Sequence, residues 1–178
     1  MDKSQKKVWK VAVVGCGAFA NWQYLPNIRK EANAEIVAAV DIIPERAQKA
    51  CEDYNIPNWY ESVYELIEKC DFDIAIDAAS IQAHHEINMA VLGAGKHLIS
   101  QKPAAPSVEM LNEQINLAKE KGVKYQMLHS YELKVPEGLT LPLKELEGLH
   151  IVDPVPADFA RILGAFELQN SSVQTEEE

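Results

Sequence analysis

The sequence has no hydrophobic run close to the roughly 20 residues that cross a bilayer, and no apolar signal-peptide core follows its charged N-terminus. Positive charge is also scarce, because 17 lysines and arginines stand against 27 aspartates and glutamates and leave a net charge of -10. Such acidity disfavours a nucleic acid or an anionic membrane surface as the partner. We therefore expect a soluble, cytoplasmic protein.

Cysteine is rare as well. The three thiols, Cys16, Cys51 and Cys70, are odd in number, widely spaced and free of any C-x-x-C pairing, which disfavours a disulfide framework and a zinc site. The run 84–86, two histidines and a glutamate, does not form H-E-x-x-H, and adjacent side chains on a helix point roughly 100° apart. We expect no metal centre, with His84 exposed on a helix.

Apolar runs alternate with amphipathic stretches along most of the chain, which is the pattern of a parallel sheet covered by helices. We expect strands near residues 8–14, 35–40, 74–77, 97–100 and 124–129, and a brief strand at 59–60. We expect helices near residues 19–32, 44–54, 62–69, 83–92 and 107–121. The predicted fold class is α/β, a doubly wound parallel sheet of the Rossmann type.

The character of the sequence changes after Tyr131. Four of the nine prolines fall in the last third of the chain, and the segment 169–178 is polar and ends in three glutamates. At 178 residues and 47% hydrophobic composition the chain can bury one sizeable core but not two full domains. We therefore predict one domain over residues 1–131 and a short irregular extension over 132–178 that ends in an acidic, disordered tail.

The stretch V-A-V-V-G-C-G-A-F-A opens the first predicted strand and helix, and a second apolar run ends in Asp41 about twenty residues later. In a dinucleotide-binding βαβ unit Gly15 would allow the tight turn, and Gly17 would let backbone amides approach a pyrophosphate. Ala18 and Phe19 would complete the cradle at the helix N-terminus. The alternative is an ordinary strand-turn-helix.

Asp41 stands where an acid would accept hydrogen bonds from the adenosine ribose hydroxyls. Its charge would repel a 2′-phosphate, and neither Ile42 nor Ile43 supplies the cation that a 2′-phosphate needs. The sequence therefore favours NAD over NADP as the cofactor.

Three further segments, taken together, resemble the Gfo/Idh/MocA family of glucose-fructose oxidoreductases and inositol dehydrogenases. They are the loop 77–85 after the third long strand, the run A-V-L-G-A-G-K-H at 90–97, and Q-K-P at 101–103. The resemblance covers about residues 7–133. It implies an NAD-dependent oxidoreductase of the sugar or polyol dehydrogenase type, which passes hydride between nicotinamide C4 and a secondary alcohol carbon.

The resemblance also implies roles for individual residues. Lys102 would meet the substrate oxygen as the catalytic lysine, beside Gln101 at the nicotinamide edge, while Ser80, Gln82 and His85 would flank the nicotinamide half of the cofactor. Two positions depart from the family pattern. Gln101 replaces the usual glutamate, and Ile81 replaces the usual proline of the preceding loop.

In the family a second domain covers the cofactor face and supplies a catalytic aspartate and histidine, and residues 132–178 would be a truncated or vestigial remnant of it. His150 is a candidate proton acceptor there, although Leu146 stands four residues before it instead of aspartate. In the alternative alignment His150 is only a residue of the strand that enters the second domain. Two other hypotheses stay open: a non-catalytic NAD(H)-binding module whose bare cofactor face meets a partner or a second copy, and a fragment of a full enzyme.

Overall fold

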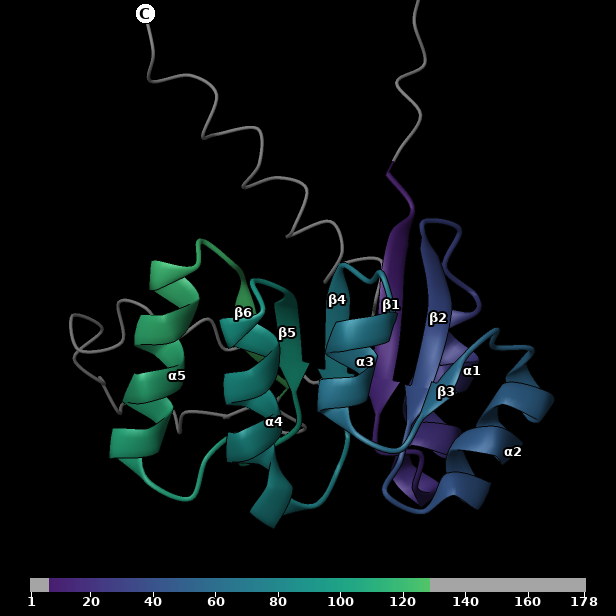
Figure 1. The fold of residues 1–178 in the computed structure, drawn as a ribbon, viewed down its shortest axis with the longest axis horizontal. Helices are drawn as coiled ribbons and strands as arrows, with labels where there is room; N and C mark the ends of the chain where they lie inside the picture. The colour runs from purple at the N-terminus through teal and green to yellow at the C-terminus, as the bar shows by residue number, and fades with distance from the viewer. Residues whose placement is uncertain (1–6, 129–178) are drawn as a thin grey trace, which may run out of the picture.

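In the computed structural model, which describes residues 7–128, six strands form one sheet in the order β3-β2-β1-β4-β5-β6 (Figure 1). The strands are β1 (Trp9–Val14), β2 (Ala34–Val40), β3 (Trp59–Tyr60), β4 (Ile74–Asp77), β5 (His97–Ser100) and β6 (Tyr125–Met127). All neighbouring strands pair in parallel. The chain thus leaves the centre of the sheet in both directions, with the switch between β1 and β4, which confirms the predicted doubly wound fold.

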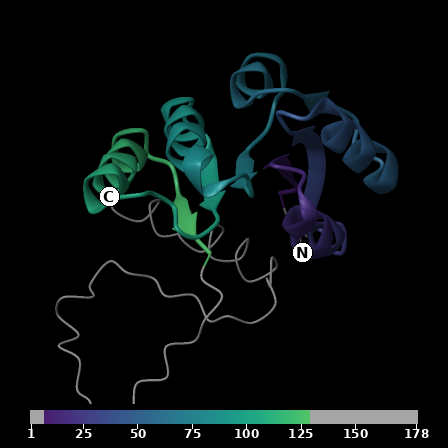
Figure 2. The ribbon, with the colours of Figure 1, turned by 90° about the horizontal axis from the view of Figure 1, so that it is seen from below.

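Helices cover both faces of the sheet. They are η1 (Ala20–Tyr24, a π-helical turn), α1 (Leu25–Ile28), α2 (Pro44–Tyr54), α3 (Val63–Lys69), α4 (Ile81–Gly93) and α5 (Val108–Glu120). The side chains of β1 alternate between two cores: Val11 and Val13 pack with η1, α1 and α2, and Ala12 and Val14 pack with α3, α4 and α5. Figure 1 shows α3, α4 and α5 in front of the strands, and Figure 2 places α1 on the other side from α4 and α5. Within residues 7–128 no helix has the length and apolar character to cross a membrane.

The carboxyl ends of the central strands are joined at one edge of the sheet. Gly15 N–H donates to Val40 O at 2.7 Å, and Ala78 N–H donates to Val14 O at 2.7 Å. One strand further along, the loop after β5 begins with a 2.9 Å bond from Gln101 N–H to the Asp77 carbonyl. The loops after β2, β1, β4 and β5 therefore start side by side.

The first helix departs from the prediction of one helix over 19–32, because the helical segment ends with α1 at Ile28 and contains the π-helical turn η1. Pro26 has no N–H to donate to the carbonyl four residues earlier, so a regular α-helical ladder is interrupted there. The Tyr54 hydroxyl donates instead to Asn21 O at 2.9 Å, which satisfies a carbonyl of this irregular turn.

The other boundaries lie within a few residues of the predicted ones. The prediction for α2, β3, β4 and β5 is confirmed to the residue. Ser107 caps α5, because its hydroxyl accepts from Met110 N–H, and Gly122 follows that helix with a φ of +63°. The predicted domain boundary at Tyr131 and the segment 132–178 lie outside the described residues, so both stay predictions.

Candidate cofactor-binding site

Gly15 forms the turn after β1 in a conformation that other residues rarely adopt. Its φ is +92°, and a Cβ at this position would lie 2.5 Å from Ala79 N and 2.7 Å from Ala78 O. The turn therefore lies directly against the backbone that follows β4. Only glycine fits here, which agrees with the role predicted for Gly15.

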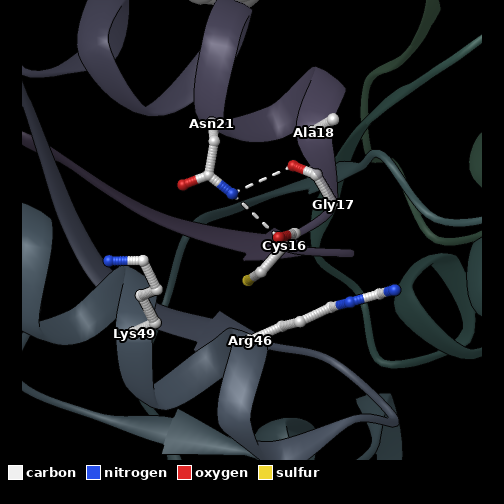
Figure 3. Close-up of a pocket in the computed structure, with 6 residues that line it drawn as sticks. All are labelled: Cys16, Gly17, Ala18, Asn21, Arg46 and Lys49. Atoms are coloured by element: carbon white, nitrogen blue, oxygen red, sulfur yellow. Dashed lines mark hydrogen bonds between the residues drawn. The ribbon is translucent and has the colours of Figure 1, made fainter.

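Gly17 differs, because a Cβ built there would meet nothing within 4 Å. The loop around it is held by Asn21, whose side-chain NH2 donates to Cys16 O at 2.8 Å and to Gly17 O at 3.0 Å (Figure 3). These bonds occupy the loop carbonyls, and the first N–H groups of the helical segment have no partners within the helix. The loop therefore presents donors beside an open space, which fits a pyrophosphate.

Asp41 is buried, with 7% of its surface exposed, and its carboxylate is held by two backbone amides. One oxygen accepts from Cys16 N–H at 2.8 Å and the other from Ile43 N–H at 2.9 Å. Each carboxylate oxygen has a second lone pair, so the group can accept further hydrogen bonds. Asp41 thus fixes the glycine loop from the neighbouring strand, and its contact with the ribose hydroxyls stays a prediction.

A cavity of about 440 Å³ lies along this edge of the sheet, within the size range of small-molecule sites. Of the predicted cofactor-binding residues, it is lined by Gly15, Gly17, Ala18, Phe19, Asp41 and Ser80. Gln82, His85, Gln101 and Lys102 are not part of its lining. The structure therefore brings together the five residues expected at the adenosine and pyrophosphate half of NAD, which fit that group, and one residue expected at the nicotinamide half, Ser80.

A second cavity, of about 290 Å³, adjoins the glycine loop, and Figure 3 shows Arg46 and Lys49 of α2 on the side opposite Asn21. Arg46 lines both cavities and, among residues 7–128, forms no hydrogen bond or ion pair with another side chain. In the sequence, Ile42 and Ile43 directly follow Asp41, so these cations were not predicted as its neighbours. The sequence does predict a helix that begins at Pro44, and the first turn of this helix brings Arg46 next to the glycine loop.

The prediction that His84 is exposed is wrong. His84 is only 1% exposed, and its Nδ1 lies 2.6 Å from a carboxylate oxygen of the fully buried Asp77. The other Asp77 oxygen accepts from Ala79 N–H at 3.0 Å. His84 faces the sheet because it shares the buried side of α4 with Ile87 and Asn88, three and four residues later. Asp77, an acid that ends an apolar strand like Asp41, was not singled out from the sequence.

His85 lies on the side of α4 that faces α5. Its Nδ1 is 3.0 Å from Gln114 Nε2, and its Nε2 is 3.5 Å from a carboxylate oxygen of Glu113. Ser80 and Gln82 are exposed at the beginning of α4. Contact of these three residues with the nicotinamide half of NAD stays a prediction.

Lys102 is exposed in the loop that joins β5 to α5. Its backbone N–H donates to the Gln101 side-chain oxygen at 3.0 Å. The Gln101 side chain is also hydrogen-bonded to the Tyr24 hydroxyl, whose pKa is raised because the ring is buried and Asp77 lies nearby. Gln101 thus links the lysine loop to η1. His150 lies outside the described residues and stays a predicted proton acceptor.

The remaining chemistry of the described residues gives no sign of a metal or redox centre. In residues 7–128 no group of three or more His, Cys, Asp or Glu residues is arranged to hold a metal ion. Burial, with a smaller contribution from Asp41, raises the pKa of the Cys16 thiol to about 12. Burial also raises the pKa of Cys51 and Cys70. These thiols are therefore poor nucleophiles at neutral pH.

Comparison with known families and proteins agrees with this geometry. A sequence model named GFO_IDH_MocA, "Oxidoreductase family, NAD-binding Rossmann fold", matches residues 9–129. The chain is 32% identical over 121 residues to the inositol 2-dehydrogenase/D-chiro-inositol 3-dehydrogenase of Lactiplantibacillus plantarum, a match that covers 67% of this chain and 34% of that enzyme. It is 34% identical over 101 residues to the inositol 2-dehydrogenase of Salmonella paratyphi B, covering 54% and 29% of the two chains. The aligned part thus spans about a third of the length of these relatives.

Solved structures show the same fold. An oxidoreductase from Agrobacterium radiobacter in complex with NAD+, L-tartaric acid and magnesium superposes with a TM-score of 0.67 at 22% identity, covering 70% of this chain and 36% of that one. The scyllo-inositol dehydrogenase of Lactobacillus casei with bound NAD(H) and scyllo-inositol gives 0.64 at 23% identity, with 68% and 36% covered.

Proposed function

The chain belongs to the Gfo/Idh/MocA oxidoreductase family, whose NAD-binding Rossmann domain it contains, and on this basis we propose that it takes part in the NAD-dependent oxidation of a sugar or polyol. The substrate class is supported by the names of the relatives, which are inositol dehydrogenases. In this proposal the reacting group is a secondary alcohol.

The observation that carries the proposal is the arrangement of three loops at one edge of the sheet. Gly17 and the adjoining amides follow β1 and would bind the pyrophosphate, and Asp41 follows β2 and would hold the adenosine ribose. Lys102 follows β5, on the other side of the β1–β4 switch, where the nicotinamide end of an extended dinucleotide would lie. The order along the edge matches the order of groups along NAD.

Oxidation of an alcohol to a ketone removes a hydride from carbon and a proton from oxygen, and yields NADH and one proton in solution. When bound, NAD+ supplies the hydride acceptor. Lys102 would bind the substrate hydroxyl and stabilise the negative charge that develops on its oxygen. Gln101, which accepts from the backbone N–H of Lys102 at 3.0 Å and is hydrogen-bonded to Tyr24, would hold the start of this loop beside η1.

The test begins with NADH binding to the full chain. Trp22 is exposed next to the glycine loop, with its ring 5.9 Å from that of Phe19, so energy transfer from tryptophan to bound NADH gives the signal. Turnover is then measured with a panel of inositols and sugars. We expect Lys102→Met to keep NADH binding and to lower turnover about 100-fold or more, as removal of a group that acts on the reacting oxygen typically does.

The matched control is Lys119→Met, because Lys119 is an exposed lysine of α5. It should leave both binding and turnover unchanged. NADH binding without turnover on any substrate would refute the dehydrogenase proposal and would leave an NAD(H)-binding module. Turnover that survives Lys102→Met would refute the role of Lys102.

A further inference from the structure

A buried polar network anchors the loop that carries Lys102. The side chains of Asn88 in α4 and Gln114 in α5 are fully buried, and both donate to the carbonyl of Ala104 at 3.1 Å. Ala104 lies two residues after Lys102 and is itself buried. The loop therefore enters the protein interior at Ala104, and two amide side chains hold it there.

The orientation of the Gln114 amide follows from its neighbours. The Ala104 carbonyl can only accept hydrogen bonds, so the NH2 group of Gln114 must face it. The Gln114 oxygen then accepts from the Tyr125 hydroxyl and, at 3.4 Å, from Asn88 Nδ2. If the Gln114 amide were rotated by 180°, its oxygen would face the Ala104 carbonyl oxygen and its NH2 group would face the NH2 group of Asn88.

This orientation determines the tautomer of His85. Gln114 Nε2 has two hydrogens, of which one is directed to Ala104 O and the other to His85 Nδ1 at 3.0 Å. His85 Nδ1 must therefore accept, and a neutral ring carries its proton on Nε2, toward the Glu113 carboxylate at 3.5 Å. A protonated ring would bring its Nδ1–H against the Gln114 donor.

We propose that His85 is a positioning residue for Lys102: its neutral ring holds Gln114, Gln114 holds Ala104, and protonation of His85 loosens the loop. The proposal rests on the function given above only in so far as Lys102 acts on substrate. The anchoring itself is a property of the chain without substrate.

Several polar groups surround His85 and its partners. A carboxylate oxygen of Glu113 lies 3.5 Å from the Nε2 of the ring. Tyr125 stays neutral throughout, because burial raises its pKa. Three other polar groups of α4 and the adjoining strands have partners of their own: Asp77 of β4 with His84, Glu86 of α4 with Tyr64 of α3, and Ser100 of β5 with Asn88 Nδ2. Among the described residues, the buried Oδ1 of Asn88 has no hydrogen-bond partner.

The test is backbone hydrogen exchange of residues 101–107, measured by mass spectrometry on the full chain between pH 5 and 8 and corrected for the intrinsic pH dependence of exchange. In the unmodified chain we expect protection to fall about tenfold toward pH 5, the factor that one hydrogen bond is worth. His85→Asn places an oxygen where Nδ1 stood and cannot be protonated, so it should keep the loop protected at every pH. His85→Phe should lose protection at every pH.

Glu113→Gln is the matched control, since it removes the carboxylate beside Nε2 but not the acceptor at Nδ1 of His85. It should leave protection at pH 8 unchanged. Equal protection of 101–107 in the unmodified chain and in His85→Phe would overturn the proposal, as would a pH response that persists in His85→Asn. If the exchange results hold while Lys102→Met keeps full turnover, the proposed function fails and the anchoring of the loop stands.

Discussion

Alanine substitution of the two glycines in the loop after β1 should change two different properties. We expect Gly17→Ala to weaken cofactor binding and Gly15→Ala to lower the stability of the fold. Gly17→Ala adds a methyl group that meets no atom within 4 Å, at a position whose φ is not in the left-handed region. The free energy of unfolding should therefore change by less than about 1 kcal/mol, the usual scale for a compatible glycine-to-alanine change. The methyl group would instead stand in the space left for the pyrophosphate.

The expected loss is in cofactor binding. Each hydrogen bond from a loop amide to a charged phosphate contributes about 1.5–3 kcal/mol, so displacing the pyrophosphate from one donor should weaken NADH binding about 10- to 100-fold. Gly15→Ala should instead lower the free energy of unfolding. Its φ of +92° and the 2.5 Å approach to Ala79 N combine a backbone penalty with a clash against backbone atoms that cannot move aside. We expect a loss of about 2–5 kcal/mol of stability.

Urea unfolding and NADH titration on the same two variants and the unmodified chain check both expectations. The unfolding midpoint of Gly17→Ala should match that of the unmodified chain, while its dissociation constant for NADH rises. If Gly17→Ala binds NADH as tightly as the unmodified chain, the open space beside Gly17 is not the pyrophosphate site. If Gly15→Ala is as stable as the unmodified chain, the close packing of this turn on the loop after β4 is wrong.

Three further predictions concern the acids, the cations and the buried thiol. His84→Ala leaves the fully buried Asp77 without its side-chain partner and should cost about 1–3 kcal/mol in urea unfolding, whereas an unchanged unfolding midpoint would contradict the buried His84–Asp77 hydrogen bond. Asp41→Ser should raise the affinity for NADPH relative to NADH, because it removes the charge that repels the 2′-phosphate. Adding Arg46→Gln to Asp41→Ser should reverse this gain. Equal affinities for NADH and NADPH in the unmodified chain would contradict repulsion by Asp41. Burial raises the pKa of the Cys16 thiol from 9.0 to about 12 in the folded state. As the pH rises above 9, the thiol of the unfolded chain loses its proton before the folded one does. The free energy of unfolding should therefore fall between pH 9 and 12. Cys16→Ala should flatten that fall, measured as the difference between the two unfolding curves at each pH, and parallel curves would refute the assignment.

The glycine loop and Asp41 were predictable because the signals for them are local. A parallel strand buried on both faces is a short apolar run, and the residue after it necessarily emerges at the carboxyl edge of the sheet. Gly15 and Asp41 both follow such runs, so their positions at the edge could be inferred from the sequence. Arg46 could not be found this way, because its place beside the loop depends on the direction in which α2 leaves the sheet.

The buried face of α4 could not be predicted from the sequence for a different reason. Its members include His84 and Asn88 as well as Ile87 and Val91, so two of its positions are polar. Apolar periodicity therefore does not mark this face. The polar members are accommodated by partners on the strands beneath α4, since His84 bonds to Asp77 of β4 and Asn88 to Ser100 of β5. The local sequence does not show which polar residues pair between a helix and a strand.

The side chains of Asp41 and Asp77 each make one hydrogen bond to a residue nearby in the sequence and one hydrogen bond that depends on the tertiary structure. Each accepts, with one oxygen, the backbone N–H two residues later, so both form the same local turn at a strand end next to β1. They differ in the second oxygen, which binds Cys16 N–H in Asp41 and the His84 ring in Asp77. The glycine loop lies between these two turns, tied to one by the Cys16 bond and packed on the other through the Gly15 contact with Ala79. The shape of the loop is therefore set by its neighbours on both sides, so loss of either carboxylate should disturb cofactor binding even where the glycines are intact.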